Sequence, residues 1–172
     1  PQKTKLMFPR GLALDTSSSH HRLFISNTWS YCIDVVEFGN DGSITTKLFA
    51  GVPDDEGGDK VNVPLTQAQF HYPQGLVYHP QLHSLFVADS WNKSVKQIDE
   101  KRGIVTQLVK LTKAEPHYLA LVGDDLFISC WRPHVIMKVD IHTDNMKVIA
   151  GQERGRKGGG FRDGPGNIAE FS

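Results

Sequence analysis

Hydrophobic and polar residues alternate in short runs along the whole chain. In LFVAD (85–89) and SVKQID (94–99), apolar side chains occupy alternate positions or small clusters, and Gly, Asp, Asn, Ser or Pro residues bound the runs. This two-residue period is typical of half-buried β-strands, and no run carries an apolar stripe at helical spacing long enough to compete. The pattern therefore predicts an all-β protein.

One 16-residue pattern occurs three times without a gap, at residues 22–37, 84–99 and 125–140. Each copy has a phenylalanine, an aliphatic residue nine positions later and an acid thirteen positions later: Phe24, Ile33 and Glu37; Phe86, Val95 and Asp99; Phe127, Ile136 and Asp140. A proline-headed segment precedes each copy: PRGLALD from Pro9, PQGLVYH from Pro73 and PHYLALV from Pro116. Such recurrence of one unit is typical of repeat architectures.

Each unit predicts four short antiparallel strands, which in the first unit lie near residues 11–15, 23–27, 32–37 and 45–51. Radially repeated four-stranded meanders are the blades of a β-propeller. We therefore predict a segment of three blades: residues 9–72 with a long connection, 73–115, and 116–172 with a glycine-rich connection. Residues 1–8 would be the tail of a preceding connection.

The two long connections share an Ala-Gly start, a central glycine and acid cluster, and a final Ala-x-Phe. We expect Phe70 and Phe171, at those ends, to pack between neighbouring blades. The GGG run of the second connection lacks the Lys-Ser/Thr of a phosphate loop and does not continue as GxGxxG, so we expect no nucleotide and no other cofactor.

These motifs resemble the NHL-repeat β-propeller family. The middle unit carries the resemblance best, with PQGL at 73–76, VADSWN at 87–92 and Val95, and GGGFRDGPGNIAEF is similar to the family's connections. Because the family usually closes with six blades, the resemblance implies about half a ring. Either further blades of a longer chain or a second copy would complete it, since open blades leave strand edges and apolar faces bare.

The overall composition limits the classes of partner. Basic and acidic residues balance at 19 each, and no run approaches the length of a membrane span, so we expect a soluble protein without a membrane partner. Cys32 and Cys130 occupy different positions of the repeat, which predicts free, partly buried thiols and weakly favours a reducing compartment such as the cytoplasm.

Three tryptophans fall where the second strand of a unit turns into the third: Trp29, Trp91 and Trp131. Tryptophan is enriched in binding hot spots, so these residues are candidates for contacts with a protein or peptide, together with the adjacent Asp89 and Asn92. The alternative is that the rings pack one blade against the next.

A basic cluster lies in the last connection and comprises Arg154, Arg156, Lys157 and Arg162. Some NHL propellers bind single-stranded RNA on a basic face, which makes this cluster a candidate RNA site. The zero net charge and the acids Glu153 and Asp163 favour instead a solvated loop.

Metal chemistry is not favoured by the eight histidines. His20, His21, His79 and His83 are expected to be solvated turn residues, and no H-x-H or H-E-x-x-H pair occurs. PHYLAL resembles the Pro-His blade openings of amidating lyases, in which three such histidines hold zinc at the channel mouth. The matching positions that this resemblance places along the channel are Arg10, Gln74 and His117. Because a catalytic zinc site typically needs three protein ligands, we predict no metal.

The sequence thus predicts a non-enzymatic interaction or scaffold module, because no nucleophile and base pair, carboxylate pair or ligand cluster recurs at corresponding positions. Two alternatives remain open. One is a metal-dependent propeller enzyme, resembling an amidating lyase or a lactonase-like hydrolase, and the other is a propeller that binds single-stranded RNA.

Overall fold

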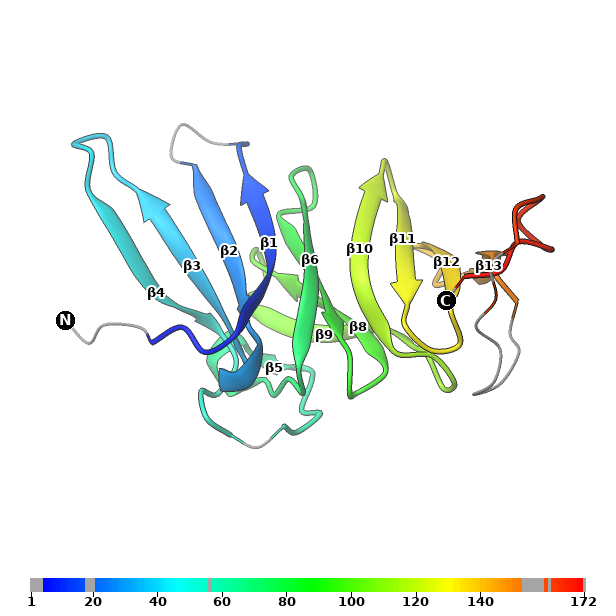
Figure 1. Cartoon of the computed structure of the whole chain (residues 1–172). Helices are drawn as coiled ribbons and strands as arrows, with labels where there is room; N and C mark the ends of the chain where they lie inside the picture. The colour runs from blue at the N-terminus through cyan, green and yellow to red at the C-terminus, as the bar shows by residue number, and fades with distance from the viewer. Residues whose placement is uncertain (1–4, 18–20, 56, 153–159, 161, 172) are drawn as a thin grey trace.

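A computed structural model describes residues 5–17, 21–55, 57–152, 160 and 162–171. In these residues the chain forms three antiparallel sheets that follow one another along the molecule (Figure 1). The all-β prediction and the prediction of propeller blades are confirmed.

The first sheet has the strand order β1-β2-β3-β4, and the third has β10-β11-β12-β13, as expected for four-stranded meanders. The bounds in the first sheet are β1 Pro9–Asp15, β2 Arg22–Asn27, β3 Cys32–Phe38 and β4 Ile44–Ala50. The bounds in the third are β10 Pro116–Val122, β11 Asp125–Cys130, β12 Val135–Asp140 and β13 Met146–Ala150.

The middle sheet contains a strand that the sequence analysis missed. Its order is β5-β9-β8-β7-β6, with β6 Pro73–His79, β7 Ser84–Asp89, β8 Ser94–Asp99 and β9 Ile104–Lys110. The additional strand, β5 Val63–Pro64, comes from the long connection and pairs with β9. Two residues are too short to show an alternating pattern, so the sequence carried no signal for it. The two short 3₁₀ turns are η1 Thr28–Ser30 and η2 Leu65–Gln67.

The first strands of the three sheets lie next to one another. Strand β6 contacts β1 on one side and β10 on the other, and the three follow each other across the middle of Figure 1. Each begins at the proline that the repeat marks: Pro9, Pro73 or Pro116. They therefore form the inner edges of successive blades.

Two apolar clusters fill the spaces between the sheets. One joins the first and middle sheets and includes Phe24, Val35, Leu76 and Leu85, and the other joins the middle and third sheets. Phe70 is fully buried in the first cluster, so its predicted packing between blades is confirmed. Phe171, its counterpart, is exposed at the edge of the third sheet.

Polar contacts also cross both spaces. Arg22 of the first sheet binds Asp15 of its own sheet and Glu100 of the middle sheet, each at 2.6 Å. His79 connects the middle and third sheets, because its Nε2 lies 3.1 Å from Asp124 Oδ1. The expectation that His79 is a solvated turn residue was therefore wrong: its ring is buried, because the next blade covers the end of β6. His21 and His83 are exposed, and His20 lies outside the described residues.

Both cysteines are free and buried, as expected. Burial raises the pKa of the Cys32 thiol to about 12, and it does the same for Cys130. Neither thiol is therefore activated as a nucleophile, because a reactive cysteine needs a lowered pKa. Within the described residues, no helix has the length and apolar character needed to span a bilayer.

The first two inner strands approach the next blade so closely that glycine is required at their third residue. A Cβ atom added to Gly75 would lie 2.6 Å from the His117 carbonyl oxygen and 2.6 Å from Tyr118 Cα, both in the next blade. A Cβ atom on Gly11 would overlap the Gln74 carbonyl oxygen. Since backbone atoms surround both positions, a side chain could be accommodated only by moving one blade away from the next.

We therefore predict that Gly75→Ala destabilises the protein by about 1–3 kcal/mol, the usual cost of overpacking a core. Urea unfolding followed by circular dichroism measures the change. Gly103→Asn is the control, because Gly103 lies in an open turn with a left-handed φ of +67° that asparagine tolerates. Equal stability of the two variants would contradict the close packing of the blades.

Candidate functional site

The three tryptophans lie at one end of the sheets, at corresponding turns between the second and third strands. Trp29, Trp91 and Trp131 follow β2, β7 and β11 and are 48%, 59% and 51% exposed. A backbone hydrogen bond of 3.0 Å fixes each turn, donated by the tryptophan N–H to a carbonyl just before the opening proline of the same blade: Met7, His71 or Glu115. The repeat thus presents an indole ring at the same turn of all three blades, with Trp131 one residue earlier in its repeat than Trp29 and Trp91.

Each indole contacts an aromatic ring of its own blade or of the connection entering it. Phe8 stacks on Trp29 with centroids 4.6 Å apart, and Tyr72 lies 4.4 Å from Trp91. Phe8 and Tyr72 both directly precede the opening proline, and both have positive φ, near +55°. The sequence analysis missed this pair, although the shared aromatic-Pro dipeptides in MFP and HYP could have signalled it.

The third blade varies this arrangement. Glu115 stands before its opening proline, and His117 instead lies 5.4 Å from the Trp131 ring, while the Arg132 guanidinium lies 4.7 Å from the same ring. Cations near an indole face are stabilised by the ring quadrupole. We call the surface formed by Trp29, Trp91 and Trp131 with Phe8, Tyr72 and His117 the aromatic end.

Asp89 and Asn92, which were predicted to contact a partner with the tryptophans, hold the turn below Trp91. Asp89 is fully buried and accepts hydrogen bonds from the His71 backbone N–H at 2.6 Å and from Asn92 Nδ2 at 2.8 Å. It also pairs with the buried Lys96 at 2.5 Å. Asp89 is thus fully engaged by internal partners, and in this structure it positions the turn.

The predicted channel residues are the second residues of the inner strands and lie close together. Arg10 Nη1 donates a hydrogen bond of 3.1 Å to Gln74 Oε1 across the first pair of blades. Burial and the positive charge of Arg10 lower the pKa of His117. The guanidinium would likewise repel a metal cation. In the described residues, no three His, Cys, Asp or Glu side chains are grouped so that they could hold a metal.

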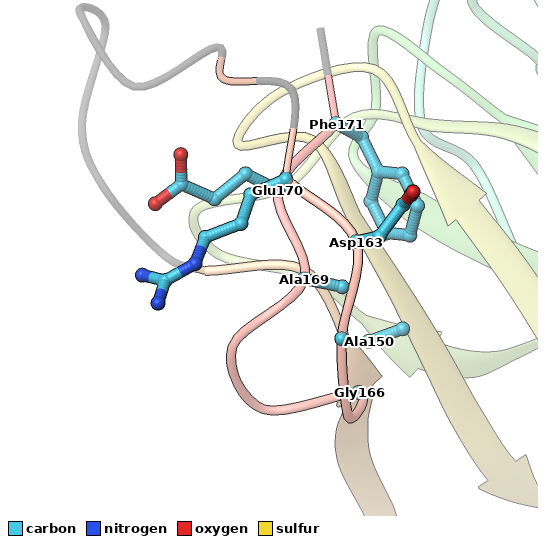
Figure 2. A pocket seen from close by; sticks show the side chains of 8 residues that line it. Ala150, Asp163, Gly166, Ala169, Glu170 and Phe171 are labelled. Carbon is cyan, nitrogen blue, oxygen red and sulfur yellow. The ribbon is translucent and has the colours of Figure 1, made fainter.

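The glycine-rich connection forms a pocket of about 500 Å³ beyond β13 (Figure 2). Asp163, Glu170 and Phe171 are among the residues that line it, and in Figure 2 the Glu170 side chain extends away from the other two. Of the predicted basic cluster, Arg162 is exposed and its backbone pairs with that of Glu170, whereas Arg154, Arg156 and Lys157 lie outside the described residues.

Comparison with solved structures finds β-propellers. A chain of the nidogen/laminin complex is 16% identical with a TM-score of 0.60, over 83% of this chain and 47% of its own length. A catalytically inactive virginiamycin B lyase from Staphylococcus aureus with quinupristin is 17% identical with a TM-score of 0.57, over 86% of this chain and 42% of its own. A protein of unknown function from Bacteroides thetaiotaomicron is 16% identical with a TM-score of 0.55, over 68% and 32%.

This chain thus spans less than half the length of these structural neighbours. No protein-family profile matches it, and no curated protein matches it in sequence. At these identities the shared feature is the propeller fold.

We predict that Lys96→Met destabilises the protein by about 3–5 kcal/mol, because it leaves the buried Asp89 carboxylate without its cation. The double variant Asp89→Asn/Lys96→Met removes both charges and should recover most of that loss. Free energies of unfolding in urea give both values. If the single variant were as stable as the double variant, the buried pair would not determine the stability of this turn.

Proposed function

We propose that the chain is a non-enzymatic interaction module, a three-blade segment of an NHL-repeat propeller that presents its aromatic end to a protein or peptide. The observation that carries the proposal is the presence of three half-exposed tryptophans at equivalent turns of three blades. Tryptophan dominates the energetics of protein contacts because it buries a large rigid surface at little entropic cost.

The indoles are supported without being enclosed. Phe8 stacks on Trp29, the tilted Tyr72 ring contacts Trp91, and backbone hydrogen bonds fix all three turns, so little side-chain freedom would be lost on binding. A pre-organised apolar surface of this kind suits a partner that brings its own apolar or aromatic side chains.

Ring completion is the second part of the proposal. Leu12 and Leu14 are exposed on the outer side of the first blade, and Tyr118 and Val122 are exposed on the outer side of the third. At the same strand positions of the middle blade, Leu76, Tyr78 and His79 are buried and Gly75 lies against the third blade. Further blades from a longer chain or from a second copy would cover the exposed residues of the first and third blades in the same way.

The double variant Trp29→Ala/Trp91→Ala tests the aromatic end. We expect binding of protein partners retained from a cell extract to weaken by about 2–4 kcal/mol, while the melting temperature stays nearly unchanged. Ile44→Ala, at an exposed position of the outer strand β4, is the matched control and should bind normally. A double variant that keeps its partners, or that melts far below the wild type, would contradict the proposal.

Metal content separates this proposal from the enzyme alternative. Zinc and calcium are measured after dialysis in wild-type protein and in His117→Ala, and we expect no stoichiometric metal in either. Metal that is present in the wild type and absent from His117→Ala would contradict the interaction module and favour the enzyme alternative.

Salt dependence separates the proposal from the RNA alternative, since phosphate binding weakens steeply as salt rises. We expect no salt-sensitive binding of a single-stranded RNA oligonucleotide. Binding that falls steeply with salt and is reduced in an Arg162→Ala variant would favour the RNA alternative.

A further inference from the structure

The third strands of the three blades carry different chemistry at one equivalent position. The β-registers pair Asp34 with Ile25 and Lys96 with Val87, and they pair Met137 with Ile128. The last residue of the second strand lies near this position in each blade. These residues are Asn27, Asp89 and Cys130. The two residues at this place are therefore a polar pair with one carboxylate in the first blade (Asn27 and Asp34) and an ion pair in the middle blade (Asp89 and Lys96). In the third blade they are an apolar pair (Cys130 and Met137).

The middle blade neutralises its buried charge internally. Lys96 is fully buried, and its Nζ lies 2.5 Å from Asp89 Oδ2, 3.0 Å from Asp59 Oδ1 and 2.6 Å from the Gln69 carbonyl oxygen. One ammonium group thus lies between two carboxylates and a carbonyl. This is the usual requirement for a charge inside a protein.

The first blade has the carboxylate without such an ammonium. Asp34 is fully buried, its Oδ2 accepts a hydrogen bond of 2.8 Å from Asn27 Nδ2, and its Oδ1 has no hydrogen-bond partner among the described residues. Burial raises the pKa of Asp34, against the opposing effect of the Asn27 hydrogen bond.

Asn27 offers no further donor. Its Oδ1 accepts from the Met7 backbone N–H at 2.6 Å, and its Nδ2 also donates to the Lys5 carbonyl at 3.0 Å. Two lysines, Lys5 and Lys47, also line the space beside Asp34, but Lys47 Nζ lies 2.9 Å from Glu37 and Lys5 is exposed.

Asp34 lies in the lining of a pocket of about 450 Å³ beside β3 and β4. Apolar groups of Met7, Leu48 and Pro53 form part of the wall, and a second carboxylate, the exposed Asp54, also lines it. The lining thus combines a surface for methylene groups with two carboxylates, and it differs from the environment of Lys96 in also containing Lys5 and Lys47.

We propose that this pocket binds a primary alkylammonium group, with the ammonium between Asp34 and Asp54 and the alkyl chain against the apolar wall. The ligand would place in the first blade the group that Lys96 supplies in the middle blade. A metal ion fits less well, because the described residues contain no group of three metal-ligating side chains. The proposal goes beyond the aromatic end and does not depend on it.

Titration of isotope-labelled protein followed by NMR tests the proposal. The probes are Nα-acetyl-lysine N-methylamide, which represents a lysine of a partner, and n-butylamine, which represents a free amine. We expect saturable shifts of the Asn27 and Asp34 amide signals with both. The Nε-acetylated lysine derivative and n-butanol, which lack the charge, should produce none.

The variant Asp34→Asn should weaken amine binding at least about tenfold, the value of a charge-assisted hydrogen bond. Asp144→Asn, the same change at an exposed residue of the third blade, should leave binding unchanged. Asp54→Asn provides a second, milder variant at the exposed carboxylate.

Stability gives an independent readout without ligand. Because the pKa of Asp34 is raised in the folded state, its ionisation costs stability as the pH rises from the unfolded-state pKa through the folded-state pKa, and the full cost is present above the latter. Asp34→Asn should therefore melt at a higher temperature than the wild type at neutral pH, and added amine should raise the melting temperature of the wild type only. Absence of saturable amine binding to the wild type, or equal binding by Asp34→Asn, would overturn the proposal.

Amine binding by the lysine derivative alone would assign the site to a partner's lysine, because that probe also carries backbone amides. Equal binding of n-butylamine would assign it to free amines. Either result supports an ammonium site.

Discussion

The close approach of successive inner strands governs this structure. At Gly11 and Gly75 the backbone of the next blade occupies the space of a side chain, so each blade is held directly against its neighbour. Apolar clusters fill the spaces between the blades, and Phe70 from the connection is fully buried in the first of them. Tyr118 occupies the same strand position in the third blade and is 60% exposed, so a further blade would have to accommodate its ring.

This packing also explains where functional groups can lie. Both faces of the middle blade are covered by its neighbours, which leaves the turns at its two ends for contacts with other molecules. The turns after β2, β7 and β11 carry the tryptophans, and the buried residues Asn27 and Asp89 fix the first two of these turns from below. In each of these two repeats, the buried residue that supports the turn and the tryptophan that is exposed on it are therefore close neighbours in the sequence.

The repeated pattern was sufficient to predict the blades, because a strand buried on one face must alternate and each blade repeats the same strands. The opening prolines coincide with the starts of β1, β6 and β10. Contacts between blades were harder to foresee. The two-residue strand β5 has no period, and His79 became buried through Asp124, which lies in another repeat.

The candidate site was predictable only in part for the same reason. The three tryptophans stood out by position, but Asp89 looked like an exposed polar residue of a turn and is fully buried. The difference between Asp34 and Lys96 is visible in the sequence, yet its meaning depends on burial and on which oxygen lacks a partner. Such properties arise from packing and cannot be read from residue type alone.

The central claim is that the indole rings of the aromatic end are exposed to solvent and free to bind. Tryptophan fluorescence tests it directly, because the chain contains three tryptophans and all of them lie at this end. We predict that acrylamide quenches the emission of the folded protein efficiently, that the emission maximum is characteristic of water-exposed indole, and that both change little on unfolding. A blue-shifted emission that acrylamide quenches only after unfolding would show that the indoles are enclosed, and would contradict the account.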